Sequence, residues 1–227
     1  MPKKQNAKPG EMDPTSFRRG PAEVHALLLE AARALFAAKG YAGTSTREIA
    51  VTAGVSEALL FRHFGTKAKL FERAVLDPIN EFIHDYIDQW TARPLDGHDP
   101  EGIARAFIDG FYRLLTENRE IVLALVTAQA YESIGELDGA SPLSRLLDEL
   151  EAVPHRVAAF RGFDFDVPVA TRLVVGMVIS MALLDNWMFP PEKKRPSRQR
   201  IVNEMVAFMT RGLARQDALA EPVEAAG

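Results

Sequence analysis

The side chains with the most distinctive chemistry lie in the first third of the chain. Arg47 and Arg62 carry guanidinium groups, Glu57 carries a carboxylate, and Ala58 and Leu59 are apolar. A guanidinium such as that of Arg47 can bind guanine through two hydrogen bonds, a carboxylate can accept one from cytosine N4, and an apolar side chain can contact the methyl group of thymine. These residues could read DNA base edges if one surface presents them together. Glu57 has an equally good alternative interpretation, because acidic residues favour the first turn of a helix.

Two short helices that cross closely would position such side chains, and the segment 45–64 has the sequence of such a pair. Ala50 and Ala53 supply the small residues that a close crossing needs. Gly54 tolerates the positive φ that a tight turn requires. Ser56 can cap the second helix, whose N-terminal end would enter the major groove. The combination predicts a helix-turn-helix at 45–64.

This part of the chain resembles the DNA-binding domain of the TetR family over about residues 21–80. The resemblance rests on Thr44-Ser45-Thr46-Arg47-Glu48-Ile49-Ala50, Ala53-Gly54-Val55-Ser56, Leu60-Phe61-Arg62-His63-Phe64, Thr66-Lys67 and Leu70-Phe71. Within it, Ser45 and Glu48 have the spacing of a capping box. Two positions depart from the family pattern: Phe61 stands where tyrosine is usual, and Ala58 where glycine is frequent. Phe61 lacks the hydroxyl group that a tyrosine would offer to a phosphate.

The resemblance also implies which side chains contact the DNA backbone. Phosphate contacts position a protein on DNA, and the resemblance assigns them to Thr44, Thr46, His63 and Lys67. Lys67 has a second argument, because a cation in the first turn of a helix opposes the helix dipole and a nearby phosphate would reverse that balance. A solvated lysine and a packed histidine are the alternative interpretations of Lys67 and His63. Ser56 is a helix cap and also a candidate phosphate ligand.

Basic residues concentrate near the N-terminus. Residues 1–75 contain 12 Lys and Arg against 7 Asp and Glu, whereas residues 76–227 contain 15 against 24. The first segment is therefore basic and the remainder acidic, which predicts that only the first segment contacts a polyanion. Residues 1–20 are expected to form a disordered basic arm, which could add salt-dependent affinity for DNA or merely solubility.

Apolar residues recur with the period of an α-helix along most of the chain, and no segment shows the period of a strand. The pattern predicts an all-α protein of about nine helices. The N-terminal helix-turn-helix domain is expected at 21–66, and a larger helical ligand-binding and dimerisation domain at 67–217. Residues 67–91 would form a linking helix, which Pro78 should kink or divide and in which it could act as a hinge. A disordered tail is expected at 218–227.

The last two predicted helices, at about 167–188 and 197–215, are the candidate homodimer interface. The first is apolar over much of its circumference, and the second carries an apolar stripe. Two such helices per subunit would form a four-helix bundle between subunits, as the resemblance implies. A two-fold dimer could then read two half-sites about 34–36 Å apart. An ordinary monomer core is the alternative. Another helix is expected to begin at Pro142 and to bend at Pro154.

A ligand pocket is expected between the helices of the larger domain. The candidate lining residues are aromatic side chains and methionines, namely Trp90, Phe107, Phe111, Tyr131, Met177, Met181 and Trp187. A filled core is the alternative, because such residues are more often core than pocket. The implied partner is a small hydrophobic or amphipathic effector that releases a repressor from palindromic operator DNA. A ligand-independent regulator and an activator remain alternatives.

Other function classes find little support in the sequence. The chain has no cysteine, which fits a reducing cytoplasm and excludes thiol chemistry and cysteine-based zinc sites. The histidines are scattered, and there is neither a phosphate-binding glycine loop nor a nucleophile elbow, so we expect no catalytic residue, cofactor or metal. The longest nearly uninterrupted apolar run, 173–184, is shorter than the about 20 residues that a membrane span needs. A cytoplasmic protein outside the membrane is expected.

Overall fold

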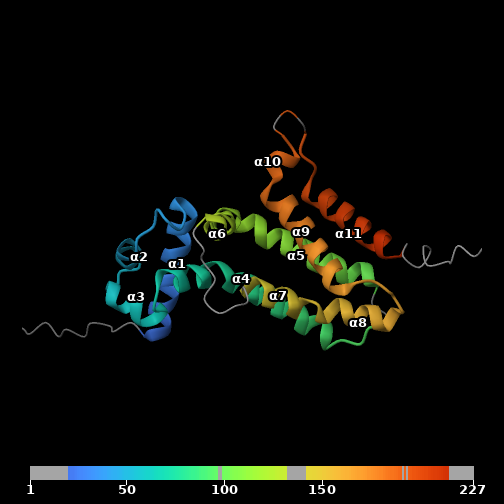
Figure 1. The fold of residues 1–227 in the computed structure, drawn as a ribbon, viewed down its shortest axis with the longest axis horizontal. Helices are drawn as coiled ribbons and strands as arrows, with labels where there is room; N and C mark the ends of the chain where they lie inside the picture. The colour runs from blue at the N-terminus through green and yellow to red at the C-terminus, as the bar shows by residue number, and fades with distance from the viewer. Residues whose placement is uncertain (1–19, 97–98, 132–141, 191, 193, 215–227) are drawn as a thin grey trace, which may run out of the picture.

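The computed structural model describes residues 20–96, 99–131, 142–190, 192 and 194–214, and every regular element within them is an α-helix (Figure 1). These helices are α1 (Pro21–Lys39), α2 (Thr46–Thr52), α3 (Glu57–Phe64), α4 (Lys67–Thr91), α5 (Pro100–Glu117), α6 (Arg119–Tyr131), α7 (Pro142–Leu150), α8 (Ala152–Arg161), α9 (Val167–Leu183), α10 (Asp185–Met188) and α11 (Arg198–Ala214). The predicted all-α class is confirmed. The predicted tail lies outside the described residues, as does the predicted arm except for Gly20.

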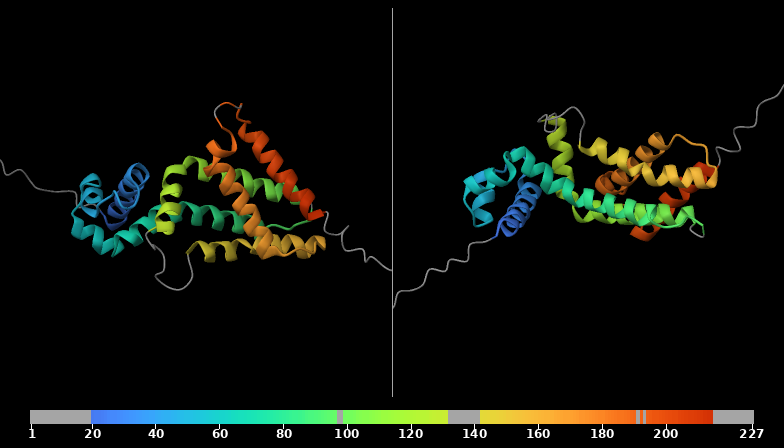
Figure 2. Two further views of the ribbon diagram at one scale, coloured as in Figure 1. Left: turned by 45° about the horizontal axis from the view of Figure 1, so that its top comes forward. Right: turned by 90° about the horizontal axis from the view of Figure 1, so that it is seen from below.

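The helices form two groups that α4 connects. α1, α2 and α3 lie together at one end of the molecule, and the larger group extends from them along α4 (Figures 1 and 2). α1 packs against α2, α4 and α6, whereas α5 packs against α9 and α11, and α4 against α7 and α8. Buried apolar side chains continue without interruption from α1 to α11. The two groups therefore share one contiguous core.

Side-chain caps set the starts of the helices that carry the predicted site. The hydroxyl oxygens of Ser45, Ser56 and Thr66 each accept a hydrogen bond from the backbone N–H three residues later, at 3.1, 3.3 and 3.1 Å. The turn between α2 and α3 contains Gly54 with φ +66°, as the sequence predicts. Glu48 does not complete the predicted capping box, because its carboxylate pairs with Lys39 of α1 instead.

α4 continues through Pro78 as a single helix, so of the two predicted outcomes at this proline, division is wrong. A proline has no N–H and leaves the carbonyl of the residue four positions earlier, here Ala74, without its helical partner. Arg33 of α1 supplies a donor, since its Nε lies 3.0 Å from the oxygen of Ala74. The same contact therefore completes α4 at its weakest point and attaches α1 to it.

Two predicted helices are each divided by a break that helical period does not reveal. Glu151 separates α7 from α8, and Pro154 lies in the first turn of α8, where a missing N–H needs no partner. The bend expected at Pro154 is therefore wrong. The second break precedes Asp185, a buried carboxylate that Arg119 and Arg195 approach to 3.2 and 2.6 Å. These breaks raise the helix count from the predicted about nine to eleven among the described residues.

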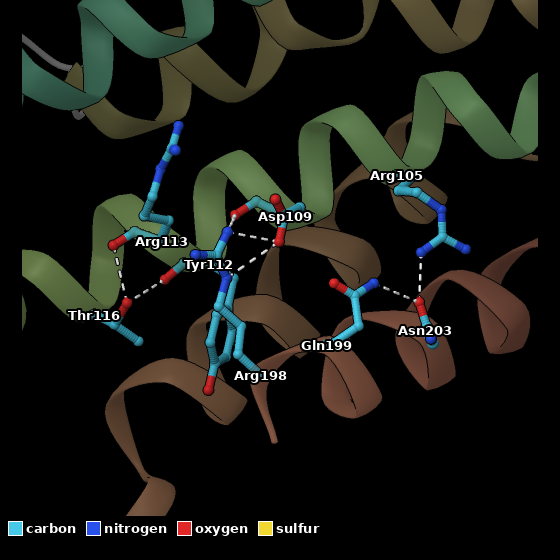
Figure 3. Close-up of polar contacts among 8 residues, drawn as sticks. All are labelled: Arg105, Asp109, Tyr112, Arg113, Thr116, Arg198, Gln199 and Asn203. Carbon is cyan, nitrogen blue, oxygen red and sulfur yellow. Dashed lines mark hydrogen bonds and ion pairs between the residues drawn. The ribbon is translucent and has the colours of Figure 1, made fainter. Parts of the chain in front are cut away.

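Polar side chains join α11 to α5 (Figure 3). Arg198 Nη2 lies 2.6 Å from Asp109 Oδ1. Asn203 Oδ1 accepts hydrogen bonds from Arg105 Nη1 at 2.6 Å and from Gln199 Nε2 at 3.0 Å. Each such exposed contact contributes only about 0–1 kcal/mol. Asp109 and Arg105 of α5 attach α11 at two points, and the Gln199 contact within α11 orients Asn203. One face of α11 is thereby held against the subunit.

Gly110 of α5 allows Phe82 of α4 to pack directly on the helix backbone. A Cβ at Gly110 would lie 2.6 Å from Phe82 Cε2, whereas a Cβ at Gly102 of the same helix would meet no atom within 4 Å. We expect Gly110→Ala to lower the free energy of unfolding by about 1–3 kcal/mol, because the ring must shift. Gly102→Ala should raise it by up to about 1 kcal/mol, because alanine favours helix. Urea unfolding followed by circular dichroism measures both, and equal effects would contradict this explanation.

Candidate functional site

Most of the residues predicted to read bases lie on the outer surface of α2 and α3. Arg47 of α2 and Ala58, Phe61 and Arg62 of α3 are exposed, and Leu59 is half-buried. The opposite side of α3 packs against α2 and α4. The structure thus brings two guanidinium groups and a mixed apolar surface to one end of the molecule. Phe61 is 44% exposed, which leaves its ring as an apolar contact surface where a tyrosine hydroxyl is absent.

Thr44 is placed differently from the prediction. It is only 1% exposed, and its hydroxyl donates to the carbonyl oxygens of Gly40 at 2.8 Å and Leu35 at 3.2 Å. A phosphate contact by Thr44 is therefore wrong, because the side chain is enclosed and its donor is used within the protein. Thr44 instead ties the loop before α2 to the end of α1. Two carbonyl groups near the C-terminus of α1 gain a donor in this way.

Thr46 and Glu57 contact each other across the turn of the helix-turn-helix. The hydroxyl of Thr46 donates to Glu57 Oε1 at 2.5 Å, and both residues are half-buried. The contact bridges the first residues of α2 and α3, so it holds the Glu57 carboxylate in place. A carboxylate here is favourable in the first turn of α3. It also retains lone pairs that can accept a hydrogen bond from cytosine N4, so both interpretations of Glu57 stay open.

Lys67 lies at the start of α4, over the aromatic ring of Tyr41. Its Nζ is 4.1 Å from the ring centroid, and Tyr41 in turn contacts the rings of Phe36 and Phe71 in the core. A cation–π interaction thus holds the ammonium group next to a helix N-terminus. A phosphate bound there would be stabilised by the ammonium charge and by the N–H groups of the helix. Tyr41 has no sequence signal for this role, because the contact joins a loop to a helix start much farther along the chain.

His63 is half-buried beside α1. Its ring centroid lies 6.1 Å from that of His25, which stacks on Phe64 at 4.7 Å. The imidazole thus packs in part against a neighbouring helix, which favours the interpretation of His63 as a packed histidine. The exposed remainder of the side chain lies near the end of α3.

A cavity of about 270 Å³ lies within the larger group of helices, between α4, α5, α8, α9 and α11. Its wall is mainly apolar and includes Phe107, Val153, Phe163, Phe165 and Val174. This volume approaches the lower end of the range of small-molecule sites, about 300–1,000 Å³. A compact apolar ligand would fit it.

The polar groups inside the cavity wall are hydroxyls, supplied by Tyr86, Thr171 and Thr210. Tyr86 donates to Ile103 O at 3.4 Å, and burial raises the pKa of its phenol, so the group stays neutral. Thr210 donates to Val206 O at 2.9 Å. Thr171 is 7% exposed, and its Oγ1 has no hydrogen-bond partner among the described residues. A buried hydroxyl without a partner costs about 1–3 kcal/mol, so a polar ligand atom beside it would be stabilised.

Of the predicted pocket residues on the middle helices, the structure brings Phe107 to the cavity. Trp90 and Phe111 are buried elsewhere in the core, and the Tyr131 side chain lies outside the described part of the chain. The other lining residues come mainly from the first half of α5, from α8 and α9, and from the turn at 162–166. Helical period identifies these residues as apolar, but it does not show that they enclose a space together.

The two methionines of the predicted pocket do not line this cavity. Met177 and Met181 line a groove of about 620 Å³ between α9 and α11. Trp187 of α10 is 82% exposed, and Leu173 of α9 and Phe208 of α11 are 69% and 76% exposed. α9 and α11 therefore present a large apolar surface to the outside.

The described helices include none with the length and apolar character to span a bilayer. In the same part of the chain, His, Asp and Glu residues form no group of three that could hold a metal ion.

A known family of bacterial regulators matches the helix-turn-helix region. The sequence model of the family described as bacterial regulatory proteins, tetR family, matches residues 28–74. The HTH-type transcriptional repressor Rv3405c of Mycobacterium tuberculosis is 43% identical over 101 residues, which are 40% of this chain and 50% of that protein. The chain thus spans about half the length of the curated relatives that it matches first.

Solved structures are similar over more of the chain. A TetR-like transcriptional regulator from Rhodococcus sp. RHA1 has a TM-score of 0.59 and 20% identity, with 87% of this chain and 99% of that chain covered. The transcriptional regulator FadR of Bacillus subtilis, solved with stearoyl-CoA, has a TM-score of 0.61 and 15% identity, with 83% and 98% covered. Such low identities show the fold alone. The family match at residues 28–74 and the relatives named as HTH-type regulators identify the helix-turn-helix region of this chain as a DNA-binding domain of the tetR type, and the rest of the chain has the fold of the regulators named above.

Proposed function

We propose that this protein is a transcriptional repressor that binds palindromic operator DNA as a homodimer and is released by a small effector. DNA binding is carried by the outer surface of α2 and α3, where Arg47 and Arg62 are exposed beside a capped helix N-terminus. Arginine fits guanine in the major groove with two hydrogen bonds. Repression, rather than activation, is supported by the relative from Mycobacterium tuberculosis that is named as a repressor. The protein would act on DNA in the cytoplasm.

The homodimer is proposed to form through α9 and α11. Leu173 and Phe208 are mostly exposed on these helices, whereas Val178, Val202 and Val206 of the same helices are fully buried within the subunit. Each helix therefore has one apolar face in the subunit core and a second one outside it. Large exposed apolar surfaces mark interaction sites, and a two-fold dimer would cover the same surface on both subunits.

α4 offers a mechanical connection between effector and DNA. It begins with Lys67 at the DNA-facing end and carries Tyr86 in the cavity wall. Nineteen residues of helix correspond to about 28 Å along the axis. A ligand that displaces Tyr86 would move this helix, and the contact of Arg33 with Ala74 beside Pro78 would transmit the movement to α1. The spacing of the two reading heads in the dimer would then change.

The cavity favours the interpretation of this protein as a ligand-responsive regulator over the alternative of a ligand-independent regulator with a filled core. A bound molecule would fill the space of about 270 Å³ and would offer a partner to the Thr171 hydroxyl, which has none among the residues that the structure describes. FadR of Bacillus subtilis, which has the same fold, was solved with a bound acyl-CoA. We therefore propose an effector site in this cavity. The chemistry of its wall, rather than the fold, determines which molecules fit.

Arg47→Ala tests the proposed DNA-binding surface. The bound sequence is first identified by in vitro selection, and affinity is then measured by fluorescence anisotropy. Arg47→Ala should weaken binding about tenfold to hundredfold, because a bidentate contact to guanine contributes about 1–3 kcal/mol.

Lys67→Ala tests the proposed phosphate contact. It should reduce the slope of the logarithm of the binding constant against the logarithm of the salt concentration by about one. Arg113→Ala, which removes the same charge from an exposed position on α5, serves as the control.

The outcomes separate the parts of this proposal. Unchanged affinity in both Arg47→Ala and Lys67→Ala would overturn the assigned surface. A loss of affinity in Arg113→Ala as large as that in Arg47→Ala would point to a general effect of charge rather than to recognition by α2 and α3.

A further inference from the structure

The rim of the cavity carries a charge that its interior lacks. Of the described residues that line the cavity, only Asp99 and Glu101 are exposed, and the others are buried or half-buried. These two carboxylates are therefore the most solvent-exposed part of the described wall. Among the described lining residues, none is a lysine, arginine or histidine.

The first turn of α5 also offers little to an anion. Pro100 has no N–H, and the N–H of Glu101 donates to Asp99 Oδ1 at 3.2 Å. Asp99 thus uses the end of the helix that would otherwise attract a negative group. Arg105 lies one turn farther on, and its guanidinium is already engaged by Glu101 Oε1 at 2.8 Å and Asn203 Oδ1 at 2.6 Å. It offsets part of the Glu101 charge, so the Asp99 carboxylate leaves the rim negative.

We propose that this cavity is selective for a lipophilic amine, with its apolar body among the helices and its ammonium group at the Asp99–Glu101 rim. The proposal rests on the effector site proposed above and names its ligand class. Thr171 is more than nine-tenths buried and has no partner in the described part of the chain, so its hydroxyl supplies a hydrogen-bonding position for a polar atom in the ligand body. Phe107 and Val174 surround the body with apolar surface.

An anionic ligand of the same shape fits poorly for a physical reason. Inside the cavity its charge would meet only neutral hydroxyls and apolar groups, and a buried charge without a partner is strongly unfavourable. At the rim it would lie beside two carboxylates. A neutral ligand of the same shape avoids this cost of burying a charge, but the carboxylates at the rim do not attract it. The expected order of affinity is therefore amine, then alcohol, then carboxylate.

Three probes with one carbon skeleton test this order: decylamine, decanol and decanoate, each titrated into the full chain by calorimetry at neutral pH. Decylamine should bind about threefold to tenfold more tightly than decanol, and decanoate more weakly than decanol by a similar factor, as expected for charges at a solvent-exposed rim. The double variant Asp99→Asn, Glu101→Gln should remove the preference, while asparagine keeps the helix cap. Glu117→Gln, an exposed acid at the other end of α5, is the matched control and should keep it.

Ala170 lies in the cavity wall, so a tryptophan at this position would fill the cavity. Ala170→Trp should therefore abolish binding of all three probes, which would show that they occupy this site. If decanoate binds as tightly as decylamine, or if the double variant keeps the preference, amine selectivity is wrong. If the three bind equally and Ala170→Trp abolishes binding, selectivity alone is wrong and the effector cavity stands. If none of the three binds, the effector site itself is overturned, whereas operator binding is measured separately.

Discussion

Replacing Leu173 and Phe208 together with glutamate should leave the protein monomeric at micromolar concentration and weaken operator binding by at least about a hundredfold. Both side chains are mostly exposed, on α9 and α11. In the proposed dimer each would become buried, and a glutamate in an apolar interface carries a desolvation cost of several kcal/mol. A monomer keeps one helix-turn-helix and loses the second half-site. Sedimentation velocity and fluorescence anisotropy measure the two effects.

Two other exposed apolar side chains provide a matched control for this variant. Val126 of α6 and Phe160 of α8 are 53% and 51% exposed, so Val126→Glu with Phe160→Glu again replaces one aliphatic and one aromatic residue. This control should remain dimeric and bind operator normally. If the Leu173→Glu, Phe208→Glu variant sediments as a dimer, the interface does not lie on α9 and α11.

Phe71→Ala should lower the free energy of unfolding by about 3–5 kcal/mol, the usual cost of removing a fully buried phenylalanine. Phe71 is 0% exposed, and its ring lies 4.8 Å from that of Phe36 and 5.0 Å from that of Tyr41. The cavity left behind would remove the support beneath Tyr41. Because Lys67 rests on Tyr41, the same substitution should also weaken operator binding. Urea unfolding and anisotropy at a temperature where the variant stays folded measure these effects.

Phe61→Ala makes the same chemical change on the outer side of α3. Phe61 is 44% exposed, so its loss should change the free energy of unfolding by no more than about 1 kcal/mol. Operator binding should still weaken, because an apolar contact surface is removed from the proposed interface. Equal losses of stability in Phe61→Ala and Phe71→Ala would contradict the placement of these two rings.

The proposed coupling through α4 depends on contacts that no sequence pattern indicates. A proline in a helix predicts a defect, and Pro78 does leave the Ala74 carbonyl without a helical partner. Whether that defect breaks the helix depends on a donor from outside it. Arg33 of α1 provides one at 3.0 Å, so α4 stays continuous from the DNA-facing end to the cavity.

Local sequence was sufficient for the helix-turn-helix. Ser45 and Ser56 each cap the helix that follows with their own hydroxyl group, and Gly54 takes the positive φ of the turn. These features act over three or four residues, so the sequence determines them almost alone. The resemblance to the TetR family could be recognised from the sequence alone, because its motif lies within and next to this short segment.

Roles that depend on surroundings were decided by the tertiary structure. Thr44 is enclosed because the end of α1 folds over it, and Glu57 is held because Thr46 lies beside it only after the two helices cross. The cavity is a space that several helices leave between them, so no single helix carries its signature. A one-dimensional pattern shows which side of a helix is apolar, but only packing decides whether that side meets core, ligand or a second subunit.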